Sequence, residues 1–86
     1  MQDTNKQMIQ NALAKVMKKL RGNKSQFIFS SESEISMSII STAERGLKDP
    51  QLTTIFKLAE AYNVKTSDFI QMIVEELPKD FSMLDK

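Results

Sequence analysis

Apolar residues recur every three or four positions over the first twenty or so residues, which predicts an amphipathic helix with lysines on its other side. The segment Thr-Asn-Lys-Gln at residues 4–7 fits a capping box, in which Thr4 caps the helix and Gln7 reaches back to it. The helix is expected to end near residues 21–23. Its inner stripe contains Met8, Ile9, Ala12, Leu13, Val16, Met17 and Leu20.

Two short helices joined by a tight turn are predicted within residues 25–50. Ser25 and Ser36 can each cap one of them, because a serine hydroxyl accepts a hydrogen bond from backbone N–H groups that have no partner inside the helix. The second of these helices is expected over residues 36–44. Gly46 suits the left-handed turn that ends it, since that conformation is cheap only for Gly or Asn.

A fourth helix is predicted after Asp49 and Pro50, with Asp49 as its cap and Pro50 at its first position. A fifth helix is predicted from residue 66 or 67, and Pro78 ends it. The inner stripe of the fourth helix is expected to contain Leu52, Ile55, Phe56, Ala59 and Tyr62. The fifth helix carries Phe69, Ile70, Met72, Ile73, Val74 and Leu77. These five helices place the chain in the all-α class.

The chain has 86 residues, which suits one domain, expected over residues 1–77 with a tail at 78–86. It has no Cys and no His, so disulfides, thiolate metal sites and the usual general base are excluded. Its two glycines form no phosphate-binding loop, and the adjacent Glu75 and Glu76 point in different directions on a helix. No enzyme activity, cofactor or metal is therefore expected. Without an apolar run of about 20 residues or a signal peptide, we expect a cytoplasmic protein and no membrane partner.

The net charge is only +1, but the charges are unevenly distributed along the chain. Residues 1–24 carry six basic side chains and one acidic one, whereas residues 66–86 carry five acidic and two basic ones. Either one face of the molecule meets a polyanion, or solvated helix faces differ by chance.

A run of residues in register across the two short helices resembles the helix-turn-helix family of phage repressors and Cro proteins, the xenobiotic-response-element type. The run comprises Ser25-Gln26, Glu44-Arg45-Gly46 and Pro50. The resemblance covers roughly residues 13–70 and implies a five-helix bundle of the phage-repressor DNA-binding-domain type, with the motif at about 25–44. It also implies a bacterial or phage origin and a repressor that binds double-stranded DNA as a homodimer on an inverted-repeat operator.

The resemblance further implies that helix 36–44 enters the major groove and that its outward residues contact base edges. Those residues are Met37, Ser38, Ser41 and Thr42. Phosphate contacts are implied for Gln26, Ser36, Lys24, Arg45 and Lys48, and a structural ion pair for Arg21 and Glu44. Because no Arg, Asn or Gln is among the base-contacting residues, direct readout is expected to be weak, and specificity relies on DNA shape and on two half-sites.

Departures from the family pattern leave a second interpretation open. Ser30 and Glu34 replace small residues of the motif, and the large apolar Phe27 and Ile28 replace polar ones. We expect this apolar pair to pack under the first helix; otherwise it marks a protein contact. The motif also has one basic residue against three acidic ones, which is unfavourable near phosphate. The alternative function is a protein-interaction module or an antitoxin-type partner-binding protein, whose contact face is Phe27, Ile28, Met37 and Ile39.

The predicted fifth helix carries more apolar residues than one face of a small domain needs. We expect a two-fold dimer contact there, made by Met72, Ile73 and Leu77. In the tail, Phe81, Met83 and Leu84 either join this contact or fold back on the core of their own domain.

Overall fold

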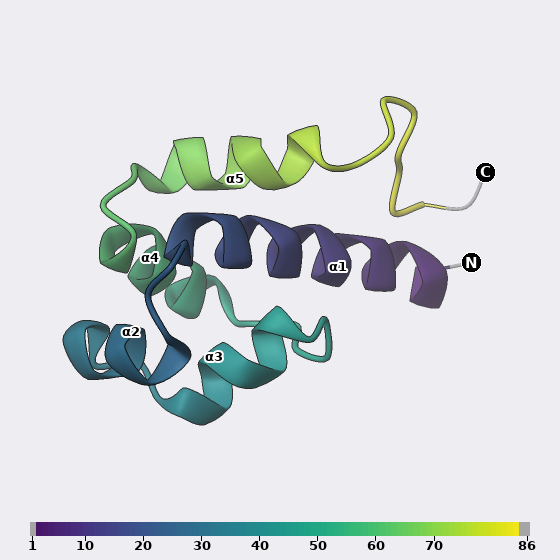
Figure 1. Cartoon of the computed structure of the whole chain (residues 1–86). Helices are drawn as coiled ribbons and strands as arrows, with labels where there is room; N and C mark the ends of the chain where they lie inside the picture. Colours follow the sequence, from purple (N-terminus) through teal and green to yellow (C-terminus); the bar gives the residue numbers. More distant parts are fainter. Residues whose placement is uncertain (1, 85–86) are drawn as a thin grey trace.

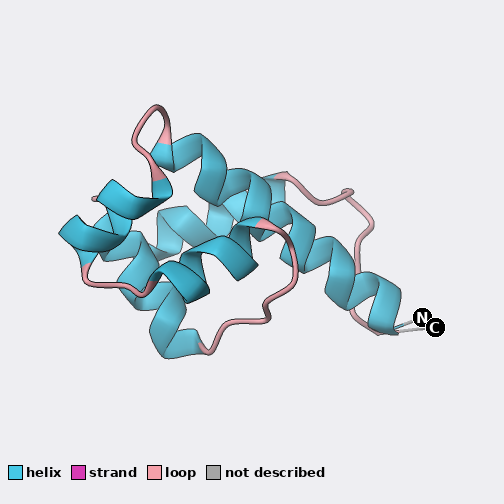
Figure 2. Cartoon of the chain, turned by 60° about the horizontal axis from the view of Figure 1, so that its bottom comes forward, coloured by secondary structure: helices cyan, strands magenta, loops and turns pink. Residues whose placement is uncertain are grey.

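The computed structural model describes residues 2–84, which form five helices and no strand, so the all-α prediction is confirmed. The helices are α1 (Gln2–Arg21), α2 (Gln26–Ser33), α3 (Met37–Glu44), α4 (Leu52–Ala61) and α5 (Thr66–Glu75). The long α1 crosses the molecule, with α5 along one side of it and the α2–α3 pair along the other (Figure 1). Loops join the helices, and the longest described ones are residues 45–51 and 76–84 (Figure 2).

The N-terminal boundary of α1 differs from the prediction. Thr4 lies inside the helix, so the expectation that Thr4 caps it is wrong. Residues 2 and 3 include neither Gly nor Pro, and the helix therefore continues through them. At the other end of α1, three basic residues in the last turn oppose the negative end of the helix dipole. Gly22 then takes the left-handed conformation that ends the helix, with φ 62°.

The start of α4 also differs from the prediction. The helix begins at Leu52 after Gln51, so neither Asp49 nor Pro50 has the predicted capping position. Asp49 instead approaches α1, where its carboxylate lies 3.7 Å from the ammonium nitrogen of Lys6. Pro50 lies in the loop between α3 and α4, and Gln51, which precedes α4, is extended.

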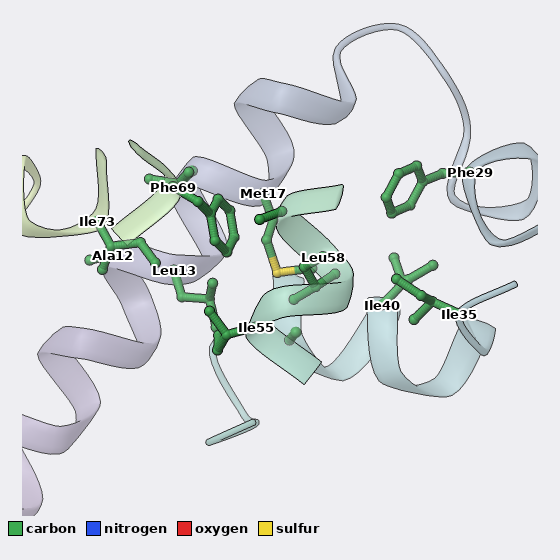
Figure 3. Close-up of a cluster of buried hydrophobic side chains, with 13 residues drawn as sticks. Ala12, Leu13, Met17, Phe29, Ile35, Ile40, Ile55, Leu58, Phe69 and Ile73 are labelled. Carbon is green, nitrogen blue, oxygen red and sulfur yellow. The ribbon is translucent and has the colours of Figure 1, made fainter. Parts of the chain in front are cut away.

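One hydrophobic core joins all five helices (Figure 3). The side chains of Met17, Ile40, Leu58 and Phe69 are fully buried at its centre. In α4 the inward stripe is Ile55, Leu58 and Ala59, whereas Leu52 and Phe56, which were predicted to face inward, are exposed. The apolar residues of α4 cover more of its circumference than one buried face, so the sequence allows the helix more than one rotation about its axis. Packing against α5 and the core fixes the rotation that buries Ile55, Leu58 and Ala59.

An aromatic stack anchors α2 to the rest of the bundle. The rings of Phe29 and Tyr62 stack nearly parallel with their centroids 4.7 Å apart, and the Phe69 ring lies tilted against Tyr62 with a centroid distance of 5.9 Å. The Tyr62 hydroxyl is buried and has no hydrogen-bond partner among the described residues. Burial, and to a lesser extent the charge of Glu44, raises the Tyr62 pKa above its ordinary value, so this group stays neutral at every physiological pH.

Candidate nucleic-acid interface

Serine residues cap both helices of the central motif, as predicted. The Ser25 hydroxyl accepts a hydrogen bond from the Ile28 amide at 3.1 Å, and the Ser36 hydroxyl accepts one from the Ile39 amide at 3.2 Å. Ser25 and Ser36 are exposed, so both helices begin at the surface, and their first N–H groups have no partner inside the helix. Such a helix N-terminus favours an anionic ligand because of these N–H groups and the helix dipole.

The inner side of α3 packs in the core and leaves a polar outer side. Ile40, Ala43 and Glu44 are buried. On the opposite side Met37 and Ser38 are exposed, and Ser41 and Thr42 are half-buried. The Thr42 hydroxyl donates to the backbone oxygen of Ser38 at 2.7 Å, so it offers a ligand only its lone pairs and its methyl group.

The predicted pair between Arg21 and Glu44 is present, and it joins three helices. Arg21 Nε and Nη2 each donate to one oxygen of the Glu44 carboxylate at 2.7 Å, and Gln26 Nε2 donates to the same carboxylate at 3.0 Å. Burial alone would raise the pKa of Glu44. The hydrogen bonds from Arg21 and Gln26 and the nearby charges of Arg21 and Lys18 outweigh it and hold that pKa below its usual value. The hydrogen bond to Glu44 likewise raises the pKa of Arg21, so both groups are charged.

The five residues predicted to contact phosphate differ in how free their side chains are. The Gln26 amide is held by Glu44, and Lys24 forms an ion pair with Glu32 on the surface. Ser36, Arg45 and Lys48 are exposed. No ion pair involves Arg45 or Lys48 among the side chains of residues 4–84, so these are the two predicted phosphate ligands whose charges are available there.

The outer face of α2 is apolar, contrary to the expectation that Phe27 and Ile28 pack under α1. Phe27 is 70% exposed, and Ile28 is also exposed. The helix turns Phe29 inward instead, and the Ser30 hydroxyl donates to the backbone oxygen of Ile35 across the turn. Glu34, where the family pattern has a small residue, takes the left-handed conformation with φ 62°.

On α5, the structure corrects one of the predicted dimer contacts. Ile73 is buried in the core, while Met72 and Leu77 are half-buried against it. The exposed apolar residues of this helix are Ile70 and Val74. They border two adjoining apolar hollows of about 550 and 270 Å³, and both hollows are lined by Ile9, Val74 and Leu77. The larger hollow also includes Pro78 and Phe81, and the smaller one includes Pro50 and Ile70.

The described part of the tail runs back toward α1. Asn5 Nδ2 donates to the backbone oxygen of Ser82 at 2.8 Å, and the half-buried Phe81 forms one wall of the larger hollow. Met83 and Leu84 remain exposed. The last two residues of the predicted tail, 85–86, lie outside the described residues.

A polar contact between α1 and the loop after α3 was not predicted. Gln7 Nε2 donates both to Asn11 Oδ1 and to the backbone oxygen of Gly46, each at 2.8 Å. Gly46 has φ 72°, and a Cβ atom at that position would lie 2.6 Å from Asn11 Oδ1. The sequence offers no signal for this contact, because nothing local to Gln7 or Asn11 indicates which loop will pack beside them.

Two serine-capped helices joined by a turn, held by a buried ion pair within an all-α bundle, define a helix-turn-helix DNA-binding domain. The chain matches the model of the helix-turn-helix family of Cro and phage-repressor type over residues 13–69, and it belongs to this family. No curated protein and no solved structure matches the chain. None of the helices in residues 2–84 is long and apolar enough to cross a bilayer.

Proposed function

We propose that the protein is a sequence-specific transcriptional repressor that places α3 in the major groove of double-stranded DNA. The observation that carries this proposal is the exposed outer side of α3, with Ser38, Ser41 and Thr42, in a helix-turn-helix whose two helices are each capped by a serine and whose family binds DNA. The proposed site of action is the cytoplasm of a bacterial cell, where the genomes of the bacterium and of its phages are accessible.

The proposed base contacts are made by Met37, Ser38, Ser41 and Thr42. Serine hydroxyls pair with several base edges, and the methyl groups of Met37 and Thr42 suit the thymine methyl group. Because none of these contacts is bidentate, one α3 helix alone discriminates weakly. The repressor therefore needs DNA shape and a second half-site for its specificity.

The phosphate contacts are proposed for Ser36, Arg45 and Lys48, with weaker contributions from Gln26 and Lys24. Gln26 is hydrogen-bonded to Glu44 and Lys24 is paired with Glu32, so each side chain must weaken or break that contact to reach a phosphate. Such contacts fix the register of the protein on the duplex and make its affinity fall with salt.

The proposed homodimer contact is the apolar flank of α5, made of Ile70, Val74 and Leu77 with the edge of Met72. Its support is the pair of apolar hollows that this flank borders. Val74→Asp should therefore separate the two copies, because it would place a charge in the dimer contact. Sedimentation at micromolar concentration would show a monomer for Val74→Asp and a dimer for Gln71→Asp, which adds the same charge to an exposed position of α5. A wild-type monomer under these conditions would contradict the dimer.

The experiment that tests the function is selection of fragmented bacterial and phage DNA by the purified protein. It should be carried out at about 0.15 M salt, where exposed non-specific contacts are substantially screened. We expect enrichment of one inverted repeat whose half-sites lie about one helical turn apart. If the folded protein enriches no site, DNA recognition is wrong, and the exposed Phe27, Ile28 and Met37 make a protein partner the next hypothesis.

A further inference from the structure

The charges near the turn that precedes α3 differ from those near the loop that follows it. Near the turn that precedes α3, a polar hollow is lined by Glu32, Glu34 and Glu60 with a single base, Lys57. This hollow carries a net negative charge and supplies no free positive charge for a phosphate group beyond Lys57. The positive charge that a duplex on α3 needs must therefore come mainly from the other end of the helix.

At the end of α3, a hollow of about 480 Å³ opens between α1 and the first residues of the following loop. It is lined by Asn11, Ala14, Lys15 and Lys18 of α1 and by Glu44, Arg45 and Gly46. The acidic group in this lining, Glu44, is 4% exposed, and its charge is balanced by Arg21. The exposed charges of the hollow are therefore positive.

The three bases of this hollow differ in availability. The ammonium nitrogen of Lys15 lies 3.1 Å from a carboxylate oxygen of Glu76, the residue that caps the C-terminus of α5, so the charge of Lys15 is partly neutralised. Lys18 and Arg45 are exposed and have no ion-pair partner within the described residues. Lys18 and Arg45 line the same hollow beside the end of α3.

The hollow continues the outer side of α3 and has a fixed wall. Arg45 follows Ser38 and Ser41 at helical spacing, so a ligand of those serines runs on toward Arg45. On the α1 wall, Gln7 Nε2 donates to Asn11 of the same helix and to the backbone oxygen of Gly46, and the second of these hydrogen bonds ties α1 to the loop. The two walls are thus held at one separation, as a binding site for a small rigid group requires.

We propose that this hollow binds one backbone phosphate of the duplex whose major groove receives α3. Lys18 and Arg45 donate to the phosphate oxygens, and Lys15 stands at the rim. The proposal rests on the proposed function and adds α1 to the DNA interface. It also accounts for how a motif with one basic residue and three acidic ones approaches DNA: the missing positive charge comes from the neighbouring helix.

The test compares Lys18→Ala with Lys19→Ala on the selected operator. Both variants remove one charge from the last turns of α1, but Lys19 does not line the hollow. We expect Lys18→Ala to reduce the magnitude of the slope of log K against log salt by about one unit. If the two proteins bind equally at 1 M salt, this change in slope corresponds to roughly fivefold weaker binding of the variant at 0.15 M. Lys19→Ala should change both much less. Ethylation interference should lose one phosphate signal per half-site with Lys18→Ala alone.

Three results decide the matter. A lost phosphate signal together with the larger slope change in Lys18→Ala supports the phosphate site. Equal losses in the two variants, with unchanged interference patterns, show that Lys18 adds only to the general field and overturn the site while leaving the DNA-binding function intact. A wild-type protein that binds no duplex overturns both.

Discussion

The turn before α3 and the last turn of α3 each contain a glutamate, but the surroundings of the two are opposite. Glu44 is buried at the end of α3, shares its carboxylate with Arg21 and Gln26, and is followed by Gly46 in the left-handed turn. Glu34 is exposed, has no ion pair within residues 2–84, and itself occupies the left-handed conformation. The end near α1 is satisfied and relaxed, whereas the turn before α3 is strained and anionic.

This difference shows which part of the motif determines the position of α3. A three-helix hydrogen-bonded network holds the last turn of α3 against α1 and against the start of α2. At the turn, the position of α3 depends on the burial of Ile35 and on short-range hydrogen bonds of Ser30 and Ser33, none of which reaches α1. We therefore expect substitutions near α1 to change stability and DNA binding together, and substitutions at the turn to change them little.

Glu44→Ala should have the largest effect. It leaves the Arg21 guanidinium without its partner in a mostly buried site, and breaking such a pair costs about 3–5 kcal/mol. Arg21 retains some contact with water, so we expect a loss of about 3 kcal/mol in the free energy of unfolding, measured by urea denaturation. The matched control is Glu32→Ala, which breaks an exposed ion pair and should cost less than about 1 kcal/mol. Equal losses in the two variants would contradict the special role of Glu44.

The same carboxylate predicts how stability depends on pH. Because the pKa of Glu44 is lower in the folded state than in the unfolded state, its contribution is fully present above the unfolded value, about 4.3, and is lost as the pH falls through the folded value. Glu44→Gln should therefore have a flatter stability profile than the wild type below that pH. A parallel pair of profiles would show that Glu44 is not the responsible group.

Gly46→Ala should have the next largest effect. Alanine in the left-handed conformation costs roughly 1–2 kcal/mol, and its Cβ atom would also displace Asn11 and weaken the hydrogen bonds of Gln7. We expect a total loss of about 2 kcal/mol in urea denaturation. Gly22→Ala provides the comparison, because Gly22 has a similar φ but no atom within 4 Å of the added Cβ. If both alanine variants lose the same free energy, the contact with α1 contributes nothing.

The parts of the fold that could be predicted from the sequence depend on local signals. Ser25 and Ser36 are caps because their hydroxyls bond to amides three residues away, and this requires no knowledge of the rest of the chain. The Arg21–Glu44 pair was predicted through the family resemblance, since nothing local indicates that residues 23 positions apart will meet.

The parts that could not be predicted depend on how the helices rotate and pack. Phe56 and Ile73 each belong to an apolar stripe that is wider than the buried face, and the sequence alone does not show that Phe56 is outside and Ile73 inside. The hollow beside Lys18 has no signal of its own either, because it exists only once α1 lies beside the loop at Gly46.

Glu34→Gly should have the smallest effect, and of opposite sign. Removing the left-handed penalty gains roughly 1–2 kcal/mol, while the greater freedom of glycine in the unfolded chain costs about 0.5–1 kcal/mol, so the variant should be more stable by about 0.5–1 kcal/mol. Glu34→Gln separates the backbone from the charge, because it removes the carboxylate but keeps the strain, and it should gain nothing in urea denaturation. A gain as large in Glu34→Gln would show that charge repulsion near Glu60, rather than backbone strain, destabilises the turn. The difference between the two ends of α3 would then be electrostatic alone.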